Sequence, residues 1–369
     1  MKSFNFILTT GLLLFRRCLV YAEPFNFPLP NGFPFPDESA LEQLFTTAGG
    51  NFTNMPLATK FDADSLTSWK LQAFNEFMEV AFFTQLISNI TNHVPGYELD
   101  VENQSYILDT LNTIQAQEEM HAYNANDAVR NFANGSHIFP CTYVFPVSDF
   151  SSAIAFAETF TDLYIGLLTD IQMRTARSLG TDSYPIVYVL AQALGQEGQQ
   201  SGWFRSLQGK HPSSQPFLTS STRELVFSWL QRVIVPGSCP NMEDIPLQIY
   251  PTLDVKDKVV GTGPVTLLVP GVVDPASQRV VFINGALVPT VVPFNVTSIS
   301  ECGMIKGYST DARGCDKDVI TSIVAEFPYA HNVMHGMTIA TIVKEELAFV
   351  NAEGVTNATI YGPAIIQVN

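Results

Sequence analysis

The feature that most constrains this chain is a series of four long segments with helical spacing. They span approximately residues 64–92, 103–132, 149–180 and 182–209, and Pro, Gly and Asn residues separate them. Cap residues stand at their starts and Gly or Asn near most of their ends, as helix boundaries require. Each segment has roughly 25 to 31 residues, well above the mean helix length. Long helices joined by short or moderate loops predict an antiparallel four-helix bundle.

Patterns outside these segments predict a different structure on each side of the bundle. Ser221-x-x-Glu224 is a capping-box pattern, so we expect a fifth, short helix that ends before Pro236. Short β-branched runs split by Pro, Gly and Asn fill the chain beyond about residue 252 and predict a β-sandwich-like domain. The stretch that precedes the bundle is rich in Phe, Pro, Asn and Gly, which predicts an irregular lead with little regular structure.

The first residues, MKSFNFILTTGLLLFRRCLVYA, predict a secretory signal peptide with a cut after Ala22. An uncleaved anchor is the alternative, but the apolar run is too short to span a bilayer. We therefore expect a secreted or cell-surface protein with no integral membrane segment after cleavage. The expected fold class is α+β multidomain, divided into signal peptide, Phe/Pro-rich lead, helical bundle and β-rich domain over residues 1–22, 23–60, 61–250 and 253–369.

Sequons and cysteines agree with secretion. Six Asn-x-Ser/Thr sequons are candidate glycosylation sites, at Asn51, Asn89, Asn103, Asn134, Asn295 and Asn357. Four cysteines remain after signal removal, an even number suited to two disulfides. A bridge from Cys141 to Cys239 would tie the ends of the bundle, and one from Cys302 to Cys315 would close a small loop in the β domain. Spacing alone allows three pairings.

The net charge limits the partners of this protein. The chain carries a formal charge of −16 at pH 7. Such an acidic surface argues against nucleic acid and anionic lipid as partners, and it attracts cations. An extracellular or cell-wall partner stays open.

Glu118 and His121 form a Glu-x-x-His pair on the second long segment. They share one helical stripe with Ile107, Leu111, Ile114 and Ala125. The pair therefore lies on the apolar face, which should point into the bundle. A buried charge there is costly unless it is paired or bound to a cation. The pair is a candidate metal-binding motif, although composition alone supplies such a pair by chance.

An internal repeat strengthens this interpretation. A shift of 79 residues without gaps places Glu79 on Glu158, Glu118 on Glu197, and His121 on Gln200. A carboxylate-bridged dinuclear site needs one Glu from each of two helices and a Glu-x-x-His from each of the other two. Five of the six positions match this requirement, namely Glu79, Glu118, His121, Glu158 and Glu197. The sixth should be His and is Gln200, while Glu76, one turn before Glu79, is a further candidate ligand.

Four motifs carry a resemblance to a known family: FNEFMEVAFF, IQAQEEMHAY, AFAETFTDLYIG and ALGQEGQQSGWFR. The segment from about 62 to 235, about half the chain, resembles the ferritin-like proteins of the fungal stress-response and sexual-development type, which are related to desiccation-related bacterial proteins. This resemblance implies a secreted or surface bundle but no specific reaction. The wider ferritin-like fold implies iron or manganese ligands at the five matching positions, and Gln200 departs from that pattern.

Three functions remain open at this stage. The first is a secreted, stress- or development-associated protein with a divergent or degenerate carboxylate metal site. The second is a di-iron or di-manganese oxidase, peroxidase or catalase. The third is a structural or adhesive cell-wall protein whose contacts are made by the β domain. A relic site that holds no ion is the alternative to metal, with glutamates hydrogen-bonded to Gln72, Gln117, Gln196 and Gln200.

Other candidate residues are weaker. His331 and His335 have an i, i+4 spacing but lie in the strand-rich tail. Tyr123 and Tyr164 lie near the site in sequence, where buried aromatic packing is the commoner role of such residues. No nucleophile elbow, phosphate-binding loop or Cys/His nucleophile pattern stands out.

Overall fold

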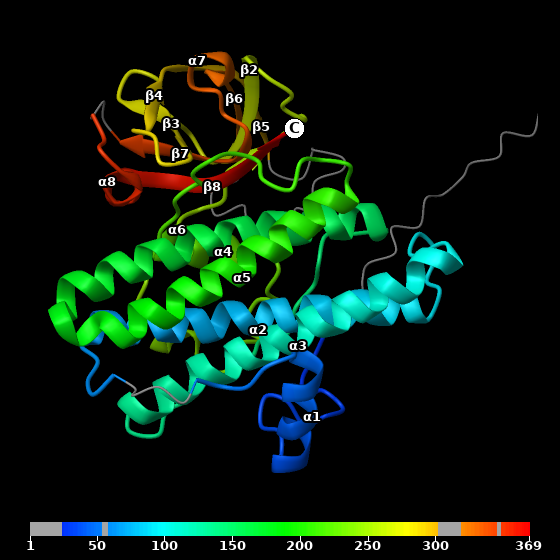
Figure 1. Cartoon of the computed structure of the whole chain (residues 1–369). Helices are drawn as coiled ribbons and strands as arrows, with labels where there is room; N and C mark the ends of the chain where they lie inside the picture. Colours follow the sequence, from blue (N-terminus) through cyan, green and yellow to red (C-terminus); the bar gives the residue numbers. More distant parts are fainter. Residues whose placement is uncertain (1–23, 54–57, 302–318, 345–347) are drawn as a thin grey trace, which may run out of the picture.

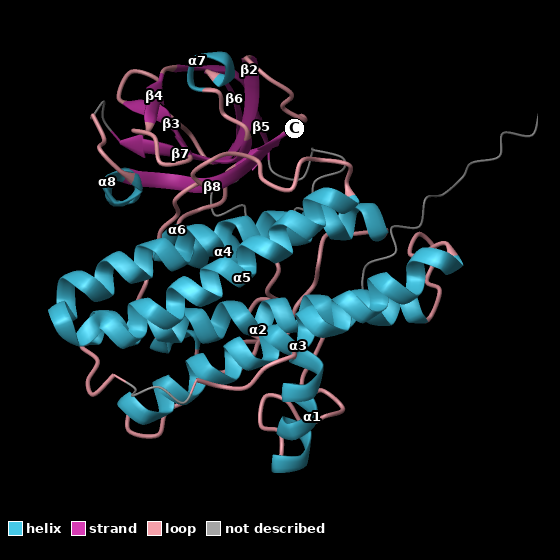
Figure 2. Ribbon diagram, viewed as in Figure 1, coloured by secondary structure: helices cyan, strands magenta, loops and turns pink. Residues whose placement is uncertain are grey.

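Helices and strands occupy separate parts of the molecule (Figures 1 and 2). The computed structural model describes residues 24–53, 58–301, 319–344 and 348–369. A layered group of helices lies on one side, and two antiparallel sheets lie against it on the other. The predicted mixture of long helices and a β-rich tail is confirmed. Within the described residues no helix is long and apolar enough to cross a membrane.

Four long helices form the helical part, as the sequence predicts. They are α2 (Ala63–Thr91), α3 (Val101–Phe132), α4 (Phe150–Leu179) and α5 (Tyr184–Leu207). Helix α2 packs along α3, α4 packs along α5, and α2 meets α4. Local caps fix two of the starts: Asp62 accepts from the Ser65 amide at 2.8 Å, and Asp149 accepts from the Ser152 amide at 2.7 Å. Each such cap stabilises a helix by about 1 kcal/mol.

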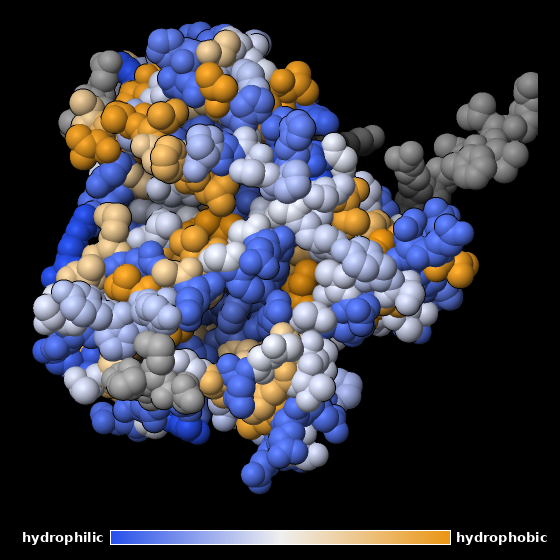
Figure 3. Space-filling model, viewed as in Figure 1, coloured by the Kyte–Doolittle hydropathy of each residue, from blue (hydrophilic) through white to orange (hydrophobic). Residues whose placement is uncertain are grey.

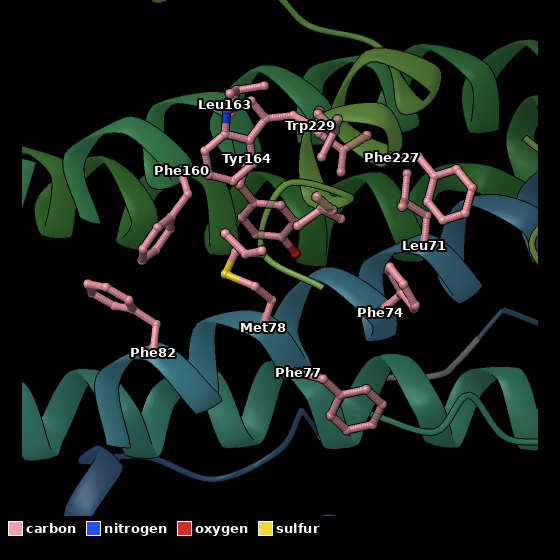
Figure 4. Close-up of a cluster of buried hydrophobic side chains, with 14 of the residues drawn as sticks. Leu71, Phe74, Phe77, Met78, Phe82, Phe160, Leu163, Tyr164, Phe227 and Trp229 are labelled. Atoms are coloured by element: carbon pink, nitrogen blue, oxygen red, sulfur yellow. The ribbon is translucent and has the colours of Figure 1, made fainter. Parts of the chain in front are cut away.

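Aromatic side chains fill the space between α2 and α4 (Figure 4). Phe82 of α2 meets Phe160 of α4 with ring centroids 5.1 Å apart and nearly perpendicular planes. Met78 and Tyr164 lie between the same two helices, and both are buried. Full burial of a large apolar side chain stabilises the fold by about 1.5 to 3 kcal/mol. This apolar packing fixes the positions of the polar residues described below.

The predicted short helix exists, but its predicted cap does not form. Helix α6 (Arg223–Leu230) has Thr222 as its N-cap, and the Ser221 hydroxyl is buried with no hydrogen-bond partner in the residues that the structure describes. A Cβ added at Gly166 of α4 would lie 2.9 Å from the Ser221 Cβ, so α4 holds this segment by close packing. Asp170 of α4 accepts a hydrogen bond from the Arg223 amide at 3.2 Å. A tertiary contact thus replaces the local capping box.

The lead is more ordered than its composition predicts. Helix α1 (Glu38–Ala48) lies within it, so the expectation of an irregular lead is wrong there. Asp37 caps its start and Gly49, with φ 75°, ends it in the left-handed conformation that suits glycine. Its residues Leu44 and Ala48 pack on α3, which stabilises a helix too short to persist alone.

The strands form two four-stranded antiparallel sheets, with orders β1-β2-β6-β5 and β4-β3-β7-β8. Their bounds are β1 Asp254–Val255, β2 Gly263–Pro270, β3 Gln278–Asn284, β4 Thr290–Val292, β5 Phe294–Glu301, β6 Val319–Phe327, β7 Gly336–Lys344 and β8 Thr359–Val368. Two short helices, α7 (Tyr329–Asn332) and α8 (Ala352–Ala358), lie between strands.

The sheet that contains β3 is apolar on both faces. Val280 and Phe282 point into the core between the sheets, whereas Val281 and Ile283 join the apolar core of the helices. This alternation is the two-residue period of a strand. Polar contacts reinforce the same junction: Gln367 of β8 donates to Asp162 of α4 at 3.0 Å. Sheets and helices therefore share one continuous buried surface.

One of the two predicted disulfides is present. Cys141, after α3, is bonded to Cys239, after α6, and this pairing confirms the bridge expected to tie the ends of the bundle. Cys302 and Cys315 lie outside the described residues.

Candidate metal centre

Three helices bring four carboxylates and one imidazole together in the interior. Glu76 and Glu79 come from α2, Glu118 and His121 from α3, and Glu197 from α5. Ligand atoms of Glu76, Glu118 and His121 lie within 4.8 Å of one another, and those of Glu79, Glu118 and Glu197 do the same. Glu118 belongs to both groups. We call these five residues the carboxylate cluster.

The carboxylate cluster is almost sealed from solvent. Its four carboxylates are 0–1 % exposed, whereas the His121 side chain is 23 % exposed. Burying one unpaired carboxylate is already unfavourable, and four that converge repel one another as well. The cluster therefore needs protons, hydrogen-bond donors or a cation to be stable.

Hydrogen bonds satisfy some of the oxygens. Glu118 accepts from the Gln200 amide through one oxygen and lies 2.9 Å from His121 Nδ1 through the other. The same nitrogen is 3.4 Å from a Glu197 oxygen, and because it carries one proton at most, the shorter contact is the hydrogen bond. Tyr164 of α4 donates its hydroxyl proton to Glu76.

Several other oxygens of the site have no hydrogen-bond donor among the described residues. They are buried, and they comprise Glu76 Oε2, Glu79 Oε2, both Glu197 oxygens and Gln200 Oε1. Leaving such acceptors without partners costs about 1 to 3 kcal/mol each. Divalent cations with a preference for oxygen and imidazole ligands, such as Fe²⁺ and Mn²⁺, satisfy this set of donors. The residues present thus fit a metal centre.

The electrostatics agree with this fit. Burial, reinforced by neighbouring carboxylates, raises the pKa of Glu76 and of Glu79 well above the usual range, and raises that of Glu197 to about 7. Burial alone would lower the pKa of His121, but Glu118 and the other carboxylates outweigh it and hold that pKa well above its usual value. Without a cation the cluster retains protons, and a bound cation displaces them.

Glu158, a predicted ligand, does not belong to the cluster. Its carboxylate forms ion pairs with Arg205 and Lys210, each at 2.6 Å. Glu158 and Arg205 are both buried, so α4 turns this glutamate toward side-chain cations and away from the other acids. Tyr164, six residues further along α4, is the side chain of α4 that contacts the cluster, through Glu76.

The repeat holds for α3 and α5 but not for α2 and α4. Gln196 donates to Gln117, its equivalent 79 residues earlier, at 2.8 Å, and Gln200 donates to Glu118. Repeat-related residues of α3 and α5 therefore face each other at one level of the bundle. On α2, the further candidate Glu76 lies beside Glu79 in the cluster, whereas α4 places no carboxylate there.

The structure adds two residues that sequence reasoning did not identify. Asn75 donates to Glu79 at 2.7 Å, and its position four residues earlier on the same helix face was a usable signal. Glu119 is also buried, but it lies outside the cluster and accepts from Asn31 at 2.8 Å and from Gln115. Burial raises the pKa of Glu119 to about 7.

The remaining candidate residues lie away from the cluster. His335 contacts Tyr329 at 3.1 Å, and it forms no group of three candidate ligands with His331 among the described residues. Tyr123 stacks on Phe52, as expected of a packing aromatic. The sequon asparagines Asn51, Asn103, Asn134, Asn295 and Asn357 are exposed, whereas Asn89 is half-buried on α2.

No protein-family model matches this chain, and no curated protein sequence is significantly similar to it. The chemistry available to the site therefore follows from its own residues. Those residues are a buried, acidic set of oxygen donors with one imidazole at its edge.

Proposed function

We propose that this protein is a secreted metal-binding protein that holds iron or manganese in a ferritin-like helical bundle, of the stress- or development-associated type that its sequence resembles. The observation that carries the proposal is the set of buried carboxylate oxygens for which the described residues provide no hydrogen-bond donor. Two overlapping ligand groups that share Glu118 support two cations, with Glu118 common to both. Glu76 and His121 complete one group, and Glu79 and Glu197 complete the other.

Surrounding residues support the ligands in this proposal. Asn75 and Gln200 hold Glu79 and Glu118 by hydrogen bonds, which orient their carboxylates. The apolar core excludes water and so strengthens every charge interaction inside. Gln200 stands where a second histidine is expected, so Glu76, Glu118 and His121 would give one ion an imidazole ligand, and Glu79, Glu118 and Glu197 would give the other only oxygens.

An oxidase, peroxidase or catalase activity is the second candidate, and Tyr164 favours it. Its hydroxyl contacts Glu76, and burial and nearby carboxylates raise its pKa well above 10, so it keeps its proton. Iron or manganese would supply redox chemistry at this position. The phenol would then lie one hydrogen bond from a ligand and hold a proton beside the metal.

Metal analysis of native protein tests the proposal. Protein purified from its own secretions without chelator, or loaded anaerobically with Fe²⁺ or Mn²⁺, is expected to carry one or two ions per chain. His121→Ala and Glu118→Gln should lose metal, whereas Glu119→Gln, which removes the neighbouring buried carboxylate outside the cluster, should keep it. Absence of iron, manganese and zinc from wild-type protein under both conditions would falsify the proposal.

Turnover distinguishes the two candidates. A loaded protein that consumes dioxygen or hydrogen peroxide, and that loses this activity in Tyr164→Phe while keeping its metal, is an enzyme. A loaded protein without such consumption is a binding protein.

A further inference from the structure

The cluster reaches solvent at one of its ligands. His121 is 23 % exposed, and the four carboxylates are 0–1 % exposed. His121 faces α5, since its Nδ1 lies 3.4 Å from a Glu197 oxygen. An ion that enters past His121 on its α5 side passes between α3 and α5.

Helices α3 and α5 are also the loosest neighbours in the bundle. The backbones of α2 and α3, of α4 and α5, and of α2 and α4 approach closely along their lengths, whereas those of α3 and α5 do not. Long polar side chains span the space instead: Gln196 bonds Gln117 at 2.8 Å, and Gln200 bonds Glu118. Figure 3 shows hydrophilic side chains gathered in a hollow between these helices. We call the site formed by Gln117, His121, Gln196 and Gln200 the α3–α5 opening.

The chemistry of the α3–α5 opening suits a cation. Gln196 Oε1 and Gln200 Oε1 are buried and have no hydrogen-bond donor within the described part of the chain. Amide oxygens of this kind replace the hydration water of a divalent ion. The formal charge of −16 on the chain attracts cations and repels anions.

The Gln117–Gln196 hydrogen bond closes the opening. Gln117 is held in place from the other side, because its amide nitrogen donates to the Ala48 carbonyl at the end of α1 at 3.1 Å. Gln196 forms the bridge through its amide nitrogen only, and its oxygen has no hydrogen-bond partner among the described residues. Gln196 is therefore the side of the bridge that is held less firmly. Glu118 and Glu197 lie directly after Gln117 and Gln196 in sequence, so the bridge lies beside the cluster.

We propose that divalent cations enter and leave the cluster through the α3–α5 opening, and that the Gln117–Gln196 bridge sets the rate of their passage. This inference rests on the proposed metal-binding function. It adds the route and the residues that control it. None of these glutamines needs to be a ligand in the final complex for the route to operate.

The kinetics of Mn²⁺ exchange test this proposal. Mn²⁺ uptake by the metal-free full chain, and its removal by excess chelator, are followed by the electron paramagnetic resonance signal of the free ion. Gln196→Ala should speed both rates about fivefold, the rate equivalent of one ordinary net hydrogen bond. The dissociation constant should stay within about twofold, because a barrier shared by entry and exit cancels at equilibrium.

Two further variants separate a gate from a general loosening of the helix. Gln199→Ala removes an exposed glutamine from the same helix and should leave both rates unchanged. Gln196→Lys places a positive charge at the opening and should slow uptake, whereas Gln196→Glu should speed it. Equal uptake rates in the Lys and Glu variants, or unchanged rates in Gln196→Ala, overturn the proposal.

A readout without metal keeps this test independent of the proposed function. Diethyl pyrocarbonate modifies accessible imidazoles in their unprotonated form, so the reaction is run at alkaline pH, and mass spectrometry locates the modified histidine. In metal-free protein, modification of His121 should be several-fold faster in Gln196→Ala than in Gln199→Ala. If that increase occurs but Mn²⁺ does not bind, the opening stands and the metal-binding function fails. If Mn²⁺ binds and neither its exchange rate nor the reactivity of His121 changes in Gln196→Ala, the metal-binding function stands and the proposed opening fails.

Discussion

The two halves of the helical bundle share a sequence pattern but handle buried acids in different ways. In the first half, α2 and α3 place three glutamates and a histidine in the carboxylate cluster, and one oxygen each of Glu76 and Glu79 has no donor among the described residues. In the second half, α4 contributes a neutral phenol, Tyr164, and α5 contributes Glu197. The second-half acid that matches Glu79 in sequence, Glu158, is neutralised by Arg205 and Lys210.

This difference shows what a sequence repeat determines. The repeat fixes the position of a residue along its helix, and the neighbours across the helix decide what that residue does. Glu158 meets an arginine, so its charge is balanced within the chain. Glu79 meets other acids, so its charge is balanced only by a proton, by the Asn75 amide or by a cation. The acids of the first half are therefore available to a metal, and Glu158 is not.

Breaking the ion pair of the second half is expected to have the largest effect. Glu158→Ala leaves Arg205, whose side chain is 2 % exposed, buried without its closest partner. Loss of one partner of a buried ion pair costs about 3 to 5 kcal/mol. We expect the free energy of unfolding, measured by urea denaturation, to fall by that amount while the metal content of the folded protein is unchanged.

The control for this variant is Glu102→Ala, which removes an exposed glutamate from α3 and should change stability by less than about 0.5 kcal/mol. A loss of metal in Glu158→Ala that exceeds its loss of folded protein would return Glu158 to the ligand set.

The next largest effect concerns a second acid of α4, and it depends on pH. Burial raises the pKa of Asp162 to about 6, although Gln367 and Ser201 donate hydrogen bonds to it. Its pKa is therefore higher in the folded than in the unfolded chain. The folded protein binds the extra proton between about pH 4 and pH 6, so this contribution is present at acidic pH and is lost as pH rises through 6.

Asp162→Asn should remove that dependence. A shift of about two units corresponds to about 3 kcal/mol. In paired urea titrations, the free energy of unfolding of the variant minus that of wild type should be larger at pH 7.5 than at pH 4. The increase should be most of that amount of about 3 kcal/mol. A difference between the two proteins that is the same at both pH values contradicts the assignment.

Tyr164→Phe tests the neutral contribution of α4 to the cluster, with a smaller expected effect. The change removes the proton that Glu76 accepts and leaves that buried oxygen without a donor. We expect a loss of about 2 kcal/mol of stability in metal-free protein. Tyr188→Phe, at a ring that is 51 % exposed on α5, is the matched control and should have no measurable effect. Equal stabilities of the two variants would show that Glu76 is satisfied in another way.

Much of the fold was predictable because its signals are local. Long helical periodicity and cap residues gave the four helices and their ends to within about two residues. Helix α1 was missed because its short apolar face acquires a partner only when α3 is in place. The β3 run Val280–Ile283 is apolar at every position, a pattern of strands buried on both faces, and that signal for sheet-on-helix packing was present in the sequence.

The candidate site was predictable where one helix defines it. Glu118 and His121 share a face by spacing alone, and the repeat brought Glu197 to the same level. The choice between Glu76 and Glu158 was not predictable, because it depends on Arg205, which lies 47 residues further along the chain than Glu158. A pattern of one residue type cannot report a partner that only the packed structure supplies.

Restoring the missing histidine is expected to have the smallest effect on free energy, and it is the most direct test of the comparison between the two halves of the bundle. Gln200→His gives α5 the Glu-x-x-His of α3 and adds an imidazole next to Glu118, whose hydrogen bond an imidazole N–H can still supply. We expect Mn²⁺ to bind about tenfold more tightly at the proposed site that has only oxygen ligands, equivalent to about 1.4 kcal/mol. His121→Gln, the opposite exchange, should weaken binding at the site nearer Glu76. If Gln200→His does not bind Mn²⁺ more tightly, then a missing carboxylate ligand, and not the missing histidine, limits metal binding by α4 and α5. Glu158 of α4 cannot supply that carboxylate, because it is paired with Arg205.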